Sequence, residues 1–187
     1  MNRSLQVEAA VSALRRGGVI AYPTEAVWGL GCDPFDEAAV MRLLALKQRA
    51  VGKGLILVAA DAAQLEGLVD WTALRDPARS AVLASWPGPH TWVVPATTRV
   101  PRWITGDHDG LAVRVSAHPP VAELCRGFAG ALVSTSANPS GALPPRTLAE
   151  ADATLFAALD AVLQGRTGGL RRPTPIRDAR TGAGLRD

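Results

Sequence analysis

Short apolar segments alternate with helical patterns along this chain, and this alternation constrains the fold more than any other feature. Buried strands are predicted over residues 19–22, 55–58, 91–94, 111–115, 131–134 and 161–163. Interleaved strands and helices are typical of α/β proteins, but several of the connections are too short for a helical crossover between parallel strands. We therefore predict an α/β fold with a twisted mixed sheet flanked by helices.

Helices are predicted between these strands. Apolar residues at helical spacing mark an amphipathic first helix that ends at Gly17-Gly18. Asp36 is a suitable N-cap for a second helix, which runs to Lys47. Further helices are predicted over residues 62–68, 77–84, 120–128 and 148–155, and a closing hairpin over 175–179 and 184–186.

Length and composition fit a single domain over residues 1–187. The sequence is 48% hydrophobic and 20% charged, which is ordinary for a globular domain with its own core. No apolar run approaches the roughly 18 residues that span a bilayer, and Glu8 and Arg15-Arg16 interrupt any signal-peptide core. Cys32 and Cys125 lack metal-ligand spacing, which fits a reducing compartment. We expect a cytoplasmic protein without a membrane segment or a structural metal.

The basic residues are unevenly distributed. Lysine occurs only at Lys47 and Lys53, whereas the other eighteen of the twenty basic residues are arginines. Lysine is a compact point charge and arginine a planar fork, so two neighbouring lysines indicate a local need for ammonium groups, as in phosphate binding. Six arginines lie between residues 166 and 187, against two acids, which suggests a nucleotide or RNA partner. Solvated surface charge is the alternative for both segments.

Several common nucleotide and nucleophile motifs are absent from the sequence. Gly52-Lys53 precedes Gly54 rather than Ser or Thr, so there is no Walker A motif, and no GxGxxG or GxSxG occurs. These absences argue against P-loop and Rossmann nucleotide binding and against an α/β-hydrolase nucleophile. Polar segments nevertheless follow the predicted strands, where α/β folds bind ligands.

Two of these polar segments supply candidate phosphate ligands. Lys47 and Arg49 would both point into a cleft if the chain between them is extended. In the Ser/Asn-rich segment 134–141, Ser136 and Asn138 would share one side of an extended chain and offer a hydroxyl and an amide to phosphate oxygens. A simple turn is the alternative for this second segment.

Two other positions are candidates for contact with a smaller ligand. Thr24 and Glu25 are polar and lie at the mouth of the first predicted strand, which Pro23 ends. Arg114 lies within the apolar strand segment Val113-Arg114-Val115, where a charged group needs an anion because desolvation is costly. A structural ion pair and a bound ligand satisfy that requirement equally well.

These segments resemble, in order and over essentially the whole chain, the YrdC-like family of threonylcarbamoyl-AMP synthases. The matching segments are PTEAVWGLGCDP, the K-x-R at Lys47 and Arg49, WPGPHTWVVP, AVRV, STSANPSG and PTPIRD. The resemblance implies that L-threonine, bicarbonate and ATP give threonylcarbamoyl-AMP and pyrophosphate for tRNA N6-threonylcarbamoyladenosine formation. It also implies Mg²⁺ bound through the ATP phosphates and delivery to downstream tRNA threonylcarbamoyl-transfer proteins. Direct contact with tRNA or double-stranded RNA stays open.

The same resemblance implies roles for individual residues. The catalytic group is Lys47, Arg49, Ser136 and Asn138, while Arg114 meets the threonine carboxylate. The remaining substrate-binding positions are Thr24, Lys53, Ser134, Thr174 and Arg186, with Arg186 near the nucleotide. The sequence departs from the family pattern at Ala26, Ala50, Gly54 and Thr174-Pro175, which affects the expected threonine contacts rather than the reaction.

Two other functions stay open from the sequence alone. The basic C-terminal segment would also suit a non-catalytic double-stranded RNA-binding module, which needs charge but no deep cleft. A carbamoyl-transferring relative acting on carbamoyl phosphate is the second alternative, although such domains usually occur in longer chains with zinc-finger-like cysteines. Pyrophosphate release with threonine and bicarbonate supplied or withheld would separate these functions.

Overall fold

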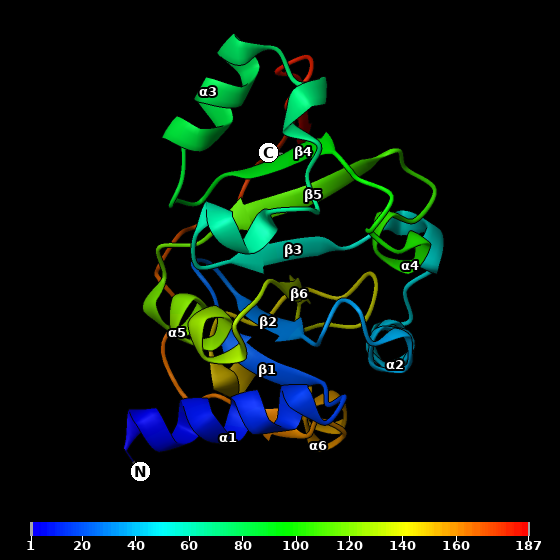
Figure 1. The fold of residues 1–187 in the computed structure, drawn as a ribbon. Coiled ribbons are helices and arrows are strands. Elements are labelled where there is room, and N and C mark those ends of the chain that lie inside the picture. Colours follow the sequence, from blue (N-terminus) through cyan, green and yellow to red (C-terminus); the bar gives the residue numbers. More distant parts are fainter. Residues whose placement is uncertain (1, 187) are drawn as a thin grey trace.

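The computed structural model describes residues 2–186, which form a nine-stranded mixed sheet with helices packed around it (Figure 1). The strand order is β7-β1-β2-β6-β3-β5-β4-β8-β9. The strands are β1 Ile20–Pro23, β2 Trp28–Gly31, β3 Ile56–Ala59, β4 Thr91–Pro95, β5 Gly110–Val115, β6 Leu132–Ser136, β7 Ala161–Val162, β8 Ile176–Asp178 and β9 Gly184–Arg186. Parallel pairing of β1 with β7, β3 with β5 and β4 with β8 occurs beside antiparallel pairs. The predicted mixed α/β sheet is therefore confirmed.

The helices are short and several carry side-chain caps. They are α1 Arg3–Arg15, α2 Glu37–Lys47, α3 Asp76–Ala84, α4 Arg102–Thr105, α5 Pro119–Phe128 and α6 Ala153–Ala157, with 3₁₀ turns η1 Val51–Lys53, η2 Ala62–Leu65, η3 Trp71–Ala73 and η4 Leu148–Glu150. The carboxylate of Asp36 accepts a hydrogen bond from Ala39 N at 3.0 Å, as predicted for the N-cap of α2. No helix within residues 2–186 is long and apolar enough to cross a membrane.

Side chains alternate between two apolar cores, one on each face of the sheet. Along β1, Ile20 and Tyr22 join the core that contains α1 and α5, whereas Ala21 joins the core that contains α2. β3 alternates in the same way, with Val58 in the first core and Leu57 in the second. Both faces of the sheet are thus covered, which explains why its strands read as continuous apolar runs.

The segment 23–34 differs from the prediction, because it contains strand β2 rather than only a loop. The chain reverses between β1 and β2 in a tight turn, in which Thr24 N donates to Val27 O at 3.0 Å. β2 then pairs with β6, and a Cβ at Gly31 would lie 2.6 Å from Val133 O. The absence of a side chain at Gly31 permits this close approach of strands.

Two predicted helices are also shorter than expected. The helix expected over 62–68 is only the 3₁₀ turn η2, and Gly67 has a φ of +74°. The helix expected over 148–155 is divided into η4 and α6 because Asp152 caps α6, accepting from Leu155 N at 2.8 Å. The short helix α4 was not predicted.

The predicted closing hairpin is present and forms one edge of the sheet. β8 pairs antiparallel with β9, and Gly182 in the turn has a φ of +75°. The Asp178 carboxylate stabilises the turn by accepting hydrogen bonds from Arg180 N at 2.7 Å and Thr181 N at 3.1 Å. This hairpin carries Arg186 to the mouth of the cavity described next.

Candidate functional site

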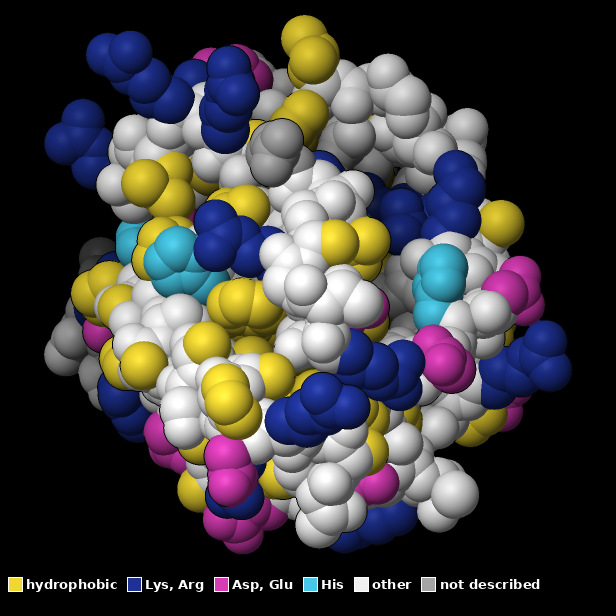
Figure 2. Space-filling view, turned by 90° about the horizontal axis from the view of Figure 1, so that it is seen from above, with side chains coloured by type: hydrophobic (Ala, Val, Ile, Leu, Met, Phe, Trp, Pro, Cys, Tyr) yellow, Lys and Arg dark blue, Asp and Glu magenta, His cyan; other side chains and the backbone are white. Residues whose placement is uncertain are grey.

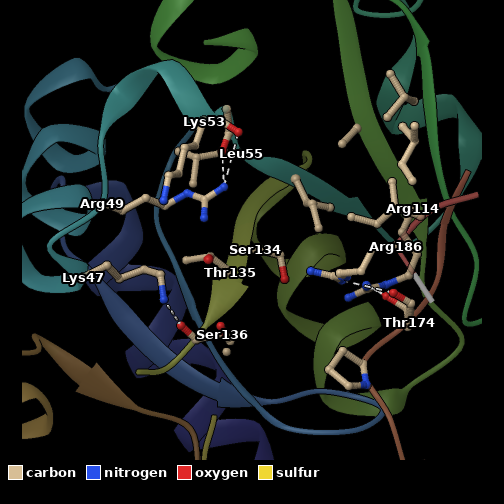
Figure 3. Close-up of a pocket in the computed structure, with 18 of the residues that line it drawn as sticks. Lys47, Arg49, Lys53, Leu55, Arg114, Ser134, Thr135, Ser136, Thr174 and Arg186 are labelled. Atoms are coloured by element: carbon tan, nitrogen blue, oxygen red, sulfur yellow. Dashed lines mark hydrogen bonds between the residues drawn. The ribbon is translucent and has the colours of Figure 1, made fainter. Parts of the chain in front are cut away.

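A cavity of about 740 Å³ lies beside β6, between α2 and η1 on one side and β5, β8 and β9 on the other (Figure 3). A volume of this size suits a nucleotide-sized ligand. All ten residues expected at the site line it, namely Thr24, Lys47, Arg49, Lys53, Arg114, Ser134, Ser136, Asn138, Thr174 and Arg186. Figure 3 shows Lys47, Arg49 and Lys53 on one side of Ser134 and Ser136, and Arg114 and Arg186 on the other. We call Lys47, Arg49 and Lys53 the α2 end, and Arg114, Thr174 and Arg186 the Arg114 end.

Lys47 is the last residue of α2 and is only 3% exposed. Its ammonium donates to Ser136 O and, at 2.7 Å, to Asn138 O. Since an ammonium has three donors, one remains for a ligand. Burial, and after it the charge of Arg49, lowers the pKa of Lys47 to about 8.

Arg49 reaches the same wall of the cavity by a route different from the predicted one. The chain between Lys47 and Arg49 is not extended, because Gln48 adopts the left-handed conformation with φ 52° and ends the helix. Arg49 Nη2 donates to Gly54 O at 2.9 Å, and Nε is buried without a hydrogen-bond partner among residues 2–186. Burial lowers the pKa of Arg49.

Lys53 lies exposed at the rim of the cavity, and its segment is joined to α4. Leu55 N donates to Ile104 O at 2.8 Å, which joins the segment to α4. Gly54 has a φ of +63°, and a Cβ there would lie 2.8 Å from Thr105 O. Close packing against α4 thus requires glycine at position 54.

Asn138 differs from its expected role as an amide donor to phosphate. Its Nδ2 donates to Pro139 O at 3.0 Å and to Ala142 O at 2.7 Å, which closes the loop after β6. Its Oδ1 is buried without a partner among the described residues. The group that Asn138 leaves unpaired is thus an acceptor, whereas Ser136 and Ser134 keep hydroxyls at the cavity.

Arg114 forms a buried ion pair with Glu25 inside the protein. The residue is 5% exposed, and its Nη1 donates to Thr174 Oγ1 at 2.8 Å and to Thr91 Oγ1 at 3.4 Å. Glu25 Oε1 lies 3.3 Å from Arg114 Nε. From the sequence, Glu25 was noted only as polar and Thr91 was not considered, because no local pattern shows that the β1–β2 turn and β4 both reach Arg114.

Arg186 completes the Arg114 end. Its Nη2 donates to Thr174 O at 3.0 Å. Burial of part of its guanidinium, followed by the charges of Arg114 and Arg49, lowers the pKa of Arg186. The three arginines therefore act on one another across the cavity, and an anion bound between them would relieve that repulsion.

The Sua5/YciO/YrdC family model, described as telomere recombination, matches residues 12–186. The chain belongs to this family. It is 59% identical over all 187 residues, and over the whole of the relative, to the threonylcarbamoyl-AMP synthase of Xanthomonas campestris pv. campestris strain B100. It is 61% identical to that of Stenotrophomonas maltophilia strain K279a, covering 98% of this chain and 99% of the relative.

The solved structures of the Sua5/YciO/YrdC family agree with the fold. The crystal structure of P. abyssi Sua5 complexed with L-threonine superposes with a TM-score of 0.85 at 30% identity. The match covers 95% of this chain and 52% of that one. The chain thus spans about half the length of that Sua5 protein, and the shared half is the domain that contains the cavity.

Proposed function

We propose that this protein is an L-threonylcarbamoyl-AMP synthase, a nucleotidyltransferase that acts on L-threonine, bicarbonate and ATP. The observation that carries the proposal is the convergence of all ten expected residues on one cavity in a chain that is 59% identical to a threonylcarbamoyl-AMP synthase over its full length. This full-length identity also favours the synthase over a carbamoyl-transferring relative.

The proposed reaction needs positioning and charge neutralisation rather than a nucleophilic side chain. The threonine amine combines with bicarbonate to give a carbamate and water, and a carbamate oxygen attacks the α-phosphorus of ATP as pyrophosphate leaves. Burial raises the pKa of the Cys32 thiol, and raises that of Cys125 to about 12, so neither cysteine provides a thiolate. Catalysis then rests on orientation and electrostatic stabilisation.

The α2 end suits the ATP phosphates. Lys47 and Arg49 are already held by backbone carbonyls, so they need little rearrangement to meet charge that develops on the leaving pyrophosphate. Ser136 adds a hydroxyl from the end of β6, and Lys53 adds a charge at the rim. Asn138 acts mainly by shaping that loop.

The Arg114 end suits the threonine. Arg114 would bind the carboxylate, while the hydroxyls of Thr24, Ser134 and Thr174 line the adjacent wall. The L-threonine complex of P. abyssi Sua5 supports threonine as a ligand, because that protein shares the fold over 95% of the present chain.

Mg²⁺ would enter with ATP, as part of the substrate. Among residues 2–186 there is no group of three or more His, Cys, Asp or Glu placed to hold a metal. Two aspartates line the cavity, but Asp178 accepts from the backbone of its own turn and Asp109 lies 3.3 Å from Arg180. The ion would therefore be coordinated by phosphate oxygens and water.

We also infer that residues 1–187 form one catalytic domain whose product passes to downstream tRNA threonylcarbamoyl-transfer proteins. A single sheet with a core on each face supports one domain, although Met1 and Asp187 lie outside the described residues. The non-catalytic RNA-binding alternative is less well supported. On the face in Figure 2, Lys and Arg side chains are dispersed among apolar and acidic ones, so any RNA contact is a secondary property.

Pyrophosphate release tests the proposed function directly. We expect release only when ATP, L-threonine and bicarbonate are all present, and a rate with L-serine about tenfold or more lower, because a missing methyl group is worth about 1–3 kcal/mol. Turnover that continues undiminished without threonine and bicarbonate would overturn the proposal. Salt-sensitive RNA binding without any ATP turnover would instead support the RNA-binding module.

A further inference from the structure

A buried carboxylate, Glu25, lies behind the Arg114 end of the cavity. Thr24 and Ala26 on either side of it line the cavity, whereas Glu25 does not and is 8% exposed. Its Oε1 accepts a hydrogen bond from Ser116 Oγ at 2.7 Å, and its Oε2 is buried without a partner among residues 2–186. A carboxylate that is only half satisfied in the interior is costly, so its retention calls for a reason other than stability.

The surrounding chain fixes Glu25 at this position. Leu170 N donates to Glu25 O at 3.0 Å, and Gly168 N donates to Thr24 O at 2.9 Å. A Cβ at Gly168 would lie only 2.9 Å from Glu25 O, so the segment around Gly168 packs directly on the turn. The carboxylate is therefore part of a rigid arrangement between the β1–β2 turn and β5.

The guanidinium of Arg114 is held on two of its three nitrogens. Nη1 donates to two threonine hydroxyls, Thr174 and Thr91. Nε lies 3.3 Å from Glu25 Oε1, within ion-pair distance but without hydrogen-bond geometry. Nη2 has no hydrogen-bond partner among the described residues, and Arg114 lines the cavity. In this orientation Nη2 is the donor left for a ligand.

We infer that Glu25 is a positioning residue for the amino-acid substrate, since it holds Arg114 with Nη2 free for the substrate carboxylate. The inference rests on the proposed function, in which Arg114 binds threonine. Without the carboxylate, Arg114 would keep only neutral partners and would turn toward other anions in the cavity. If Glu25 only neutralised Arg114, the result would be the opposite. Its loss would remove the repulsion between the Glu25 carboxylate and the substrate carboxylate, and threonine would bind more tightly.

Calorimetric titration of Glu25→Gln with L-threonine tests the inference. We expect the Kd for threonine to rise about tenfold, within the range of coupling between contacting residues, and the Kd for a non-hydrolysable ATP analogue to change less than about twofold. L-Threoninol, which lacks the carboxylate, should bind the parent and the variant equally weakly. Glu123→Gln, which removes the exposed ion pair with Arg3, is the matched control and should leave threonine affinity unchanged.

A double-mutant cycle separates positioning from a merely structural role. In an Arg114→Lys background, Glu25→Gln should cause no further loss of threonine affinity, because its effect passes through the guanidinium. An equal loss in both backgrounds, or a Glu25→Gln protein that binds threonine as tightly as the parent or more tightly, overturns the inference. A parent protein that binds no threonine contradicts the proposed function instead.

Ser116→Ala keeps the test decisive if Glu25→Gln does not fold. This variant retains the carboxylate but removes its hydroxyl donor, and we expect about a threefold rise in the Kd for threonine with the ATP analogue unaffected. Thermal melting of each variant shows whether it is folded. A folded Ser116→Ala protein with parental threonine affinity overturns the inference on its own.

Discussion

Lys47 and Arg49 at one end of the cavity and Arg114 at the other are held in different ways. At the α2 end, Lys47 and Arg49 donate to backbone carbonyls, and neither of them forms an ion pair among residues 2–186. At the Arg114 end, Arg114 is bound to side chains and faces a buried carboxylate, Glu25. Carbonyl dipoles orient a cation but leave its net charge in place. A carboxylate orients the cation and also neutralises its charge.

This difference matches the ligands proposed for each end. Uncancelled charge at the α2 end attracts a polyanion such as the triphosphate and remains available to charge that develops during reaction. A neutralised but oriented guanidinium at the Arg114 end favours one carboxylate in one geometry. The cavity thus combines one end that binds anions through its net charge with another that binds one carboxylate in a fixed orientation. The following predictions test that distinction.

Removal of either fixed cation at the α2 end should have the largest effect. We expect Lys47→Ala and Arg49→Ala each to lower kcat by about 10²–10³, the typical cost of losing one preorganised donor to transition-state charge. Lys47→Arg should fail similarly, because a planar fork does not fit between two carbonyls that receive a compact ammonium. Pyrophosphate release and thermal melting are measured together. Near-normal turnover in Lys47→Arg would show that any cation suffices there.

A change of pH should weaken only the α2 end. The folded-state pKa of Lys47 is lowered from 10.5 to about 8, so its ammonium is present below pH 8 and is lost as the pH rises through that value. With threonine and bicarbonate saturating, kcat/KM for ATP should fall by up to about tenfold per pH unit above about pH 8. An ATP profile that stays flat to about pH 10 would contradict the assignment.

The lowered pKa of Lys47 affects stability in the opposite direction from activity: as the pH rises above about 8, activity falls but the folded state becomes more stable. The unfolded chain binds the proton more tightly than the folded one, so the free energy of unfolding should rise between about pH 8 and 10.5 as far as Lys47 contributes. Denaturant unfolding of the parent and of Lys47→Met at both ends of this range isolates that contribution. The parent should gain more stability over the range than the variant does.

Loss of the rim charge should have the smallest effect. Lys53 is exposed and donates no side-chain hydrogen bond within the described residues, so solvent screens its charge. We expect Lys53→Ala to lower kcat/KM for ATP only a few-fold, and the loss to shrink as salt is added. An effect as large and as salt-independent as that of Lys47→Ala would show that the rim closes over the phosphates.

The sequence predicted the composition of the site better than its geometry. The ten residues expected from the segments that resemble the family all line the cavity, and apolar periodicity located most strands. Local reasoning failed where a backbone turn or a distant contact decides the outcome. Gln48 is left-handed rather than extended, and the Asn138 amide donates to its own loop.

The partners of Arg114 show most clearly what the sequence alone does not predict. The sequence indicates that an arginine in an apolar strand needs an anion, but it leaves the anion open. Glu25 and Arg114 are far apart in the chain, and Thr91 and Thr174 come from two further segments. Only the strand order, with β5 beside β4, and β8 beyond it, brings the threonines to the guanidinium.

The seclusion of Lys47 has a consequence for chemical labelling. An amine with a pKa near 8 is about one-tenth uncharged at neutral pH, and the uncharged amine is the form that reacts with acylating reagents. Yet only 3% of the residue is exposed, since the loop after β6 covers it. Acylating reagents should therefore modify Lys47 from the cavity side alone, and more slowly than the exposed Lys53. The chain contains just these two lysines, so the ratio of their labelling rates, read by mass spectrometry, measures how strongly the surrounding residues shield Lys47.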